Sequence, residues 1–166
     1  KGKFKDVSSQ SGIINNSIGF GLGIAIGDLN NDQWPDILVG QDYSEKDHLY
    51  INQKDGTYKE VIRTATNHIS NFSMGNDIGD INNDGWLDFI SLDMVSNNNY
   101  DLKTSMSGMN PKRFHGLVDK GLHHQYMFNA LQVNNGAMLK DGIPAFSDVA
   151  KRAGISNTNW SWAPLL

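Results

Sequence analysis

The sequence has no cysteine, so disulfide bonds and thiolate metal sites are excluded. It has no run of about 18 apolar residues, which a membrane-spanning helix requires, and no signal-peptide pattern. It also has no excess of basic residues, because the 166 residues carry a net charge of −4. We therefore expect one domain-sized segment that does not cross a membrane and does not bind nucleic acid.

Motifs that indicate catalysis are also missing. The sequence has no Gly-x-Ser-x-Gly, no His-Glu-x-x-His and no glycine-rich phosphate loop, so it nominates no catalytic or organic-cofactor-binding residue. The concentration of histidines at His115, His123 and His124 has no neighbouring carboxylate pattern. Surface or packing roles are expected for these three side chains, and the segment is predicted not to be an enzyme.

What the sequence does contain is an acidic stretch that occurs twice. Residues 27–36 read Gly-Asp-Leu-Asn-Asn-Asp-Gln-Trp-Pro-Asp, and residues 79–88 read Gly-Asp-Ile-Asn-Asn-Asp-Gly-Trp-Leu-Asp, 52 positions later. Counted from the first Asp, positions 1, 3, 5 and 9 carry side-chain oxygens in both copies: Asp28, Asn30, Asp32 and Asp36, then Asp80, Asn82, Asp84 and Asp88.

This density of oxygens predicts a calcium site in each copy. Two carboxylates about 4 Å apart repel by roughly 4 kcal/mol at an effective dielectric constant near 20, so a cation between them is favoured. The backbone carbonyl at position 7, from Trp34 or Trp86, and one or two waters complete the roughly 6 to 8 oxygens that calcium prefers; magnesium fits less well. The alternative is a pair of solvated turns that bind no ion.

The two copies differ at position 6, where Gln33 stands in the first and Gly85 in the second. This position usually requires a positive φ, which glycine adopts freely and other residues adopt at a cost of about 1 kcal/mol or more. The first site is therefore expected to bind calcium more weakly.

The residues that follow each acidic stretch predict strands. An EF-hand ends its loop with Glu at position 12, but this chain has Val39 and Ser91 there. Residues 37–39 and 89–92 are short, partly β-branched apolar runs, so each acidic stretch joins two strands. Helical calcium-binding repeats such as dockerin modules are disfavoured for the same reason.

Further short runs predict four strands in about fifty residues, which is the period of a β-propeller blade. These are residues 22–26, 37–40 and 48–52, a turn at Asp55-Gly56, and an outermost aromatic-x-acidic-Val unit that recurs at 4–7, 58–61 and 146–149. A ring needs roughly 4 to 8 blades. The prediction is therefore an all-β, partial β-propeller over 1–166, with blades at 14–61 and 68–149, flanking strands, and the start of a third blade at 150–166.

The second blade is predicted to contain an insertion. Leu49-Tyr50-Ile51-Asn52 aligns with Leu131-Gln132-Val133-Asn134 at an offset of 82 rather than 52, which places about 30 additional residues near 96–125. Within it, residues 111–120 predict a helix with Asn110 as N-cap and Pro111 at its first position, ended by Gly121.

The acidic loops resemble those of the FG-GAP or VCBS repeats of integrin α-subunit propellers and many secreted bacterial proteins. Gly19-Phe20-Gly21 and Trp162-Ala163-Pro164 resemble degenerate forms of the residues that name the family. Segments 125–129, 134–136, 146–149 and 160–164 resemble a bacterial VCBS branch related to the cartilage acidic protein and UnbV families.

The resemblance implies two Ca²⁺ ions held by the loop oxygens, an extracellular or cell-surface location, and non-enzymatic adhesion or ligand recognition with an unidentified protein or glycan. Trp34 and Trp86 are expected to pack between blades rather than to stack on a ligand. The alternative function is the propeller part of a secreted polysaccharide-degrading enzyme. That function would require His115, His123 and His124 to gather with Asp101 or Asp119 around one pocket.

Overall fold

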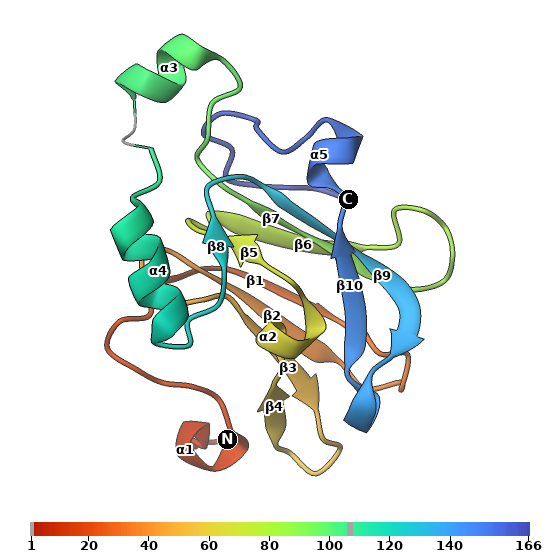
Figure 1. Cartoon of the computed structure of the whole chain (residues 1–166). Coiled ribbons are helices and arrows are strands. Elements are labelled where there is room, and N and C mark those ends of the chain that lie inside the picture. Colours follow the sequence, from red (N-terminus) through yellow and green to blue (C-terminus); the bar gives the residue numbers. More distant parts are fainter. Residues whose placement is uncertain (1, 106–107) are drawn as a thin grey trace.

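The computed structural model describes residues 2–105 and 108–166; residue 1 and residues 106–107 of the predicted insertion lie outside the described residues. Within these ranges the strands form two four-stranded sheets and one short two-stranded sheet, none of them closed (Figure 1). The elements in chain order are α1 (Ser8–Ser11), β1 (Gly21–Gly27), β2 (Asp36–Gln41), β3 (His48–Asn52), β4 (Tyr58–Glu60), α2 (Ile62–Ala65), β5 (Ile69–Ser70), β6 (Gly75–Gly79), β7 (Asp88–Leu92), α3 (Asn99–Thr104), α4 (Pro111–Asp119), β8 (Gln125–Tyr126), β9 (Ala130–Met138), η1 (Lys140–Gly142), β10 (Pro144–Asp148) and α5 (Ala150–Ala153).

The first sheet is an antiparallel meander in the order β1-β2-β3-β4. Its strands begin and end within about a residue of the predicted ones, because each apolar run is bounded by residues that favour turns. The predicted Asp55-Gly56 turn is confirmed: Gly56 has a φ of 88°, and the Gln53 amide donates to the Thr57 carbonyl at 2.9 Å.

The second sheet repeats this arrangement as β6-β7-β9-β10, with the predicted insertion between β7 and β9. The predicted helix in the insertion is confirmed as α4. The Asn110 side chain accepts hydrogen bonds from the amides of Lys112 and Arg113, Pro111 lies in the first turn, and Gly121 adopts a φ of 81° just after the helix.

The main hydrophobic core lies where the two four-stranded sheets pack against each other. Strand β1 lies close to β6, and a Cβ atom at Gly23 would come within 2.9 Å of the Asn76 amide nitrogen, so only glycine permits this approach. The buried cluster joins residues of both sheets and of α2: Leu29, Leu38, Leu49, Ile51, Val61, Ile62, Ala65, Ile69, Phe89, Ile143 and Phe146.

The other side of β6 contacts the last residues of the chain. A Cβ atom at Gly75 would lie 2.1 Å from the Trp162 carbonyl oxygen, and the Leu166 amide donates to the Asp77 carboxylate at 2.8 Å. Residues 160–166 are not assigned to a strand, so the start of a third blade at 150–166 stays a prediction.

One strand prediction is wrong. Residues 4–7 form no strand, and the Phe4 side chain is fully exposed, because no described strand lies beside this segment to pair with it. The repeated unit also contains a helical turn that the sequence did not reveal: α1, α2 and α5 each follow a Val of the aromatic-x-acidic-Val unit. Gly12 and Gly154, with φ values of 79° and 75°, end α1 and α5.

The described residues are thus mostly β, in open sheets that are consistent with part of a propeller. Among the helices of residues 2–105 and 108–166, none is both long and apolar enough to cross a membrane.

Candidate functional site

The two acidic loops lie next to each other at one end of the sheets. Residues 28–35 connect β1 to β2, and residues 80–87 connect β6 to β7, so each loop joins two antiparallel strands as predicted. The Asn31 side-chain amide donates to the Gly85 carbonyl at 3.1 Å, which links the loops directly. Figure 1 shows the inserted helices α3 and α4 at the opposite end of the sheets.

The first loop is closed by hydrogen bonds from its own backbone to its acidic side chains. Asp28 accepts from the amides of Asp32 and Gln33, at 2.9 and 2.7 Å. The Asn30 oxygen accepts from the Asp32 amide at 3.2 Å, and Asp32 accepts from the Trp34 amide at 2.9 Å. Gln33 adopts a φ of 70°, which confirms that position 6 requires the left-handed region.

The second loop makes the same bonds, 52 residues later. Asp80 accepts from the amides of Asp84 and Gly85 at 3.1 and 2.9 Å, and the Asn82 oxygen accepts from the Asp84 amide at 3.0 Å. Asp84 accepts from the Trp86 amide at 2.9 Å, and Gly85 has a φ of 84°. The two loops therefore have the same hydrogen-bonding pattern, although they differ in sequence at position 6.

The last acidic residue of each loop is buried and connects the loop to its sheet. Asp36 and Asp88 are both fully buried. Asp36 accepts from the amides of Leu29 and Asn52, both at 2.9 Å, while Asp88 accepts from those of Ile81 and Asn134, at 3.1 and 2.8 Å. These carboxylates therefore hold the loop start against the third strand of the same sheet.

The carboxylates of each loop are close enough for their negative charges to repel one another, which affects their pKa values. The pKa of Asp36 is raised to about 6, because burial and, to a smaller extent, the charges of Asp32 and Asp28 outweigh the lowering effect of its two amide donors. Burial likewise raises the pKa of Asp88, with the same sign of contribution from Asp84 and Asp80. A divalent cation beside these carboxylates would relieve that repulsion.

Asn134 is a structural residue of both loops that sequence reasoning missed. Its side-chain amide donates to the Leu29 carbonyl of the first loop at 2.9 Å and to the Leu87 carbonyl of the second at 3.3 Å, and its oxygen accepts from the Gly136 amide. Asn52, its counterpart in the first sheet, donates to the Pro35 carbonyl alone. The alignment of residues 49–52 with 131–134 already placed Asn52 and Asn134 at equivalent positions, so it could have pointed to this pair.

The loops differ in their neighbouring charges. The Lys54 ammonium lies 3.3 Å from an Asp32 carboxylate oxygen. Within the described residues, no Lys, Arg or His makes an ion pair with the second loop.

The donor set fits calcium in its chemistry, since it consists of carboxylate, amide and carbonyl oxygens, and an ammonium already stands beside one of the carboxylates. In residues 2–105 and 108–166, however, no three His, Asp or Glu side chains are already gathered as a metal site. Ion binding at Asp28, Asn30, Asp32, Trp34 and Asp36, and at Asp80, Asn82, Asp84, Trp86 and Asp88, therefore stays a prediction that requires the side chains to turn toward a common centre.

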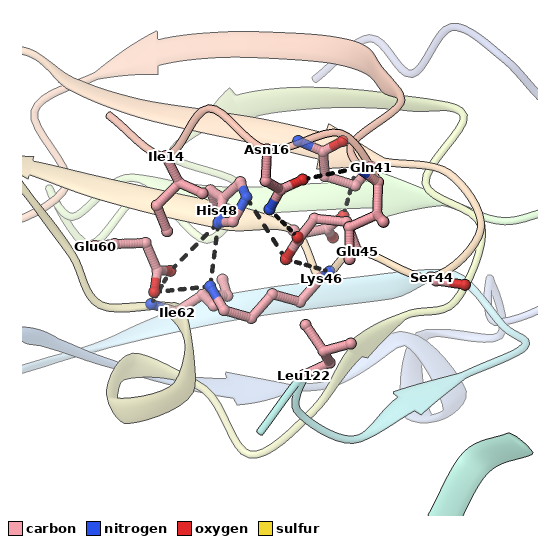
Figure 2. A network of polar contacts seen from close by, with 12 residues as sticks. Ile14, Asn16, Gln41, Ser44, Glu45, Lys46, His48, Glu60, Ile62 and Leu122 are labelled. Carbon is pink, nitrogen blue, oxygen red and sulfur yellow. Dashed lines mark hydrogen bonds and ion pairs between the residues drawn. The ribbon is translucent and has the colours of Figure 1, made fainter. Parts of the chain in front are cut away.

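A second polar cluster, which the sequence did not predict, lies at the other end of the first sheet (Figure 2). The Lys46 ammonium contacts a Glu60 carboxylate oxygen at 2.7 Å and the His48 Nδ1 atom at 3.1 Å, and Glu45 accepts from Asn16. Burial, and then the nearby Lys46, lowers the pKa of His48 to about 3. Glu45, Lys46 and His48 are buried, and contacts within the cluster satisfy their charged groups, so the cluster holds the β2–β3 connection and does not offer an open site.

The three histidines that the enzyme alternative requires do not share one cavity with Asp101 or Asp119. A cavity of about 260 Å³ is lined by Arg63, Thr66, Asn67, Val118, His123 and His124. His115, Asp101 and Asp119 do not line it, and the buried His123 ring contacts the Thr66 hydroxyl at 3.2 Å. This cavity therefore lacks the histidine–carboxylate grouping of a hydrolytic site.

The two loop tryptophans have different surroundings. Trp34 is 44% exposed, so its side chain is only partly packed. The Trp86 indole lies against the backbone of β9, where a Cβ atom at Gly136 would come within 3.1 Å of Nε1. Trp86 therefore packs on a strand of its own sheet, and the packing of Trp34 and Trp86 between blades stays a prediction.

Part of this chain matches the model of a known family. Residues 28–91 match the profile of the FG-GAP-like repeat, and the matched region runs from the first Asp of the first loop through the second loop into β7. The match supports the FG-GAP family resemblance and indicates a propeller-type segment. A comparison with curated proteins gives no match.

Proposed function

We propose that this chain is a calcium-stabilised propeller segment that serves as a non-enzymatic scaffold for adhesion or ligand recognition outside the cell. The observation that carries the proposal is the pair of acidic loops with the same hydrogen bonds, both inside the region that matches the FG-GAP-like repeat. Residues 125–129 and 160–164 further support a place in the bacterial VCBS branch.

The chain's own residues prepare each loop for an ion. The buried Asp36 and Asp88 fix the loop ends, while Asp28 and Asp80 hold the turn by accepting two amide hydrogen bonds each. The side chains of Asn30, Asp32, Asn82 and Asp84 complete the oxygen-rich sets. Calcium, when bound, would supply the positive charge that balances these carboxylates and so would stabilise the folded state.

The exposed face of β1 supports the propeller architecture. Leu22, Ile24 and Ile26 are 49%, 65% and 63% exposed. Ile78, which lies 52 positions after Ile26, packs into the core that the first sheet covers. Because Ile26 and Ile78 occupy equivalent positions in β1 and β6, we propose that the sheet of a further blade covers the apolar face of β1 in the way that the first sheet covers β6.

An extracellular location suits the proposed role of the ions. Extracellular calcium modules typically need only about 10⁻⁴ to 10⁻³ M calcium, so the sites would be filled permanently rather than act as sensors. The partner would be a protein or glycan.

Thermal unfolding tests this function. With 2 to 5 mM CaCl₂, a range set at or above the expected affinity of about 10⁻³ M, the wild-type melting temperature should rise by several degrees over that in EDTA. Asp84→Asn should reduce this increase, while Asp119→Asn, at an exposed carboxylate on α4, should not. A melting temperature that is the same in calcium and in EDTA would contradict the proposal.

A further inference from the structure

Lys54 occupies a position whose counterpart in the second sheet has no side chain. Its amide donates to the Asn52 side-chain oxygen at 2.9 Å, and the Gly136 amide donates to the equivalent oxygen of Asn134 at 3.1 Å. Both residues have left-handed backbones, with φ values of 67° and 63°. The structure therefore aligns Lys54 with Gly136, at the same offset of 82 that relates Asn52 to Asn134.

A lysine is an unexpected residue here, because a φ of 67° favours glycine. Its side chain reaches back over the first acidic loop, where the ammonium lies 3.3 Å from Asp32. Asp84, which corresponds to Asp32, forms no ion pair with any described residue. The two loops thus share their backbone bonds but differ by one positive charge.

We propose that Lys54 is a built-in counter-ion of the first loop that competes with calcium for Asp32, so that the two loops have different calcium affinities. The inference rests on the calcium binding proposed above. The first loop keeps part of its charge balanced without an ion and binds calcium more weakly. The second loop depends on the ion and binds it first.

The surroundings of Lys54 allow such competition. Its side chain is 49% exposed, and it lines a cavity of about 350 Å³ together with Asn30, Asp32, Asn52 and Gln53. The ammonium can therefore leave Asp32 for solvent when an ion enters, at the cost of a surface ion pair. A lysine that remained beside a divalent ion would repel it, and salt would weaken that repulsion.

This mechanism differs from the effect of Gln33 at position 6. The strain at Gln33 is a backbone property and does not depend on salt. The repulsion from Lys54 is a charge effect, so it should fade as the ionic strength rises toward about 0.5 M.

A calcium titration followed by amide NMR shifts reads both loops in one sample. The Gln33 and Gly85 amides are matched reporters, since each donates to the first Asp of its own loop. In wild-type protein at low salt, the Gly85 signal should saturate at lower calcium than the Gln33 signal. Lys54→Gln should lower the dissociation constant at Gln33 about 3- to 10-fold and leave Gly85 unchanged, whereas Lys54→Arg should change neither.

Lys59→Gln is the matched control, since it removes a neighbouring positive charge that pairs with Asp141 instead of the loop. It should shift the Gln33 curve less than twofold. A second readout needs no calcium: in EDTA, Lys54→Gln should melt about 1 to 3 °C below the wild type, because Asp32 loses its counter-ion.

The outcomes separate the two proposals. If neither amide responds to calcium in the wild type, the proposal of calcium binding is wrong, and the proposed competition by Lys54 is wrong as well. If both amides respond but Lys54→Gln does not tighten binding at Gln33, or Lys59→Gln tightens it equally, only the role of Lys54 is overturned.

Discussion

The two four-stranded sheets make nearly the same hydrogen bonds with different charges. The Asp32 and Asp84 amides each donate to an Asp and an Asn of their own loop, yet among the lysines that the structure describes one pairs with Asp32 and none with Asp84. The Gln41 and Asp93 amides each donate to one side chain, which is Asp47 in the first sheet and Asn129 in the second. The bonds thus belong to the repeated fold, whereas the charges distinguish one copy from the other.

Three pairs of residues carry the difference: Asp47 and Asn129, Gln33 and Gly85, and Lys54 and Gly136. Where the hydrogen bonds are the same, exchanging the residues of a pair isolates either a charge or a backbone strain.

Asp47→Asn introduces the residue of the second sheet into the first and should change how stability depends on pH. The pKa of Asp47 is raised to about 7, because burial and, to a smaller extent, the charge of Asp93 outweigh the lowering effects of the Gln41 amide, the Ser73 hydroxyl and Lys46. A carboxyl whose pKa rises on folding favours the folded state at low pH, and this contribution is lost as the pH increases from about 4 to 7. The variant has no such loss.

The free energy of unfolding of Asp47→Asn, minus that of the wild type, should therefore increase by about 2 to 4 kcal/mol between pH 4 and pH 8. Urea unfolding at several pH values measures this difference. An asparagine can keep both contacts, by accepting from the Gln41 amide and donating to the Ser73 hydroxyl. A difference that does not change with pH would show that Asp47 is ionised in the folded protein throughout.

Asn134→Ala should destabilise the protein more than Asn52→Ala. The first change leaves the Leu29 and Leu87 carbonyls and the Gly136 amide without a partner, at an expected cost of about 2 to 3 kcal/mol. Asn52→Ala leaves only the Pro35 carbonyl and the Lys54 amide, at about 1 to 2 kcal/mol. Urea unfolding of both variants compares them, and equal costs would mean that the link from Asn134 to the first loop contributes nothing.

Exchanging position 6 should have the smallest effect. Gly85→Gln should cost about 1 kcal/mol, because Gln would have to adopt a φ near 84° although no atom obstructs a Cβ there. Gln33→Gly should recover up to a similar amount in the first loop. Thermal unfolding in EDTA measures both changes. A Gly85→Gln variant as stable as the wild type would remove position 6 as a source of asymmetry between the loops.

The repeat made much of the fold predictable. An offset of 52 identified both acidic loops and the strands on either side of them, and glycine and proline signals located α4. The helical turns after Val7, Val61 and Val149 were not predicted, because segments of four residues are too short for helical periodicity to show.

Features that depend on contacts between residues far apart in the sequence could not be predicted from the repeat. Asn134 reaches Leu29 across the interface between the sheets, and Lys54 reaches Asp32 only because its backbone turns through a left-handed conformation. The contacts of Lys46 with His48 and Glu60 join the β2–β3 connection to β4, and no motif in the sequence indicated them. In each case the fold decided which polar side chains meet, and composition gave no sign of it.

Counting bound calcium tests the central claim most directly. Equilibrium dialysis of the wild type, with calcium raised to about 10 mM to cover the weakest expected affinity, should saturate at two ions per chain. Asp32→Asn and Asp84→Asn should each retain one ion, and the double variant none. Saturation at two ions, lost one loop at a time, is the result we expect. No saturable binding in the wild type, or binding that survives in the double variant, would contradict the assignment of the two acidic loops as calcium sites.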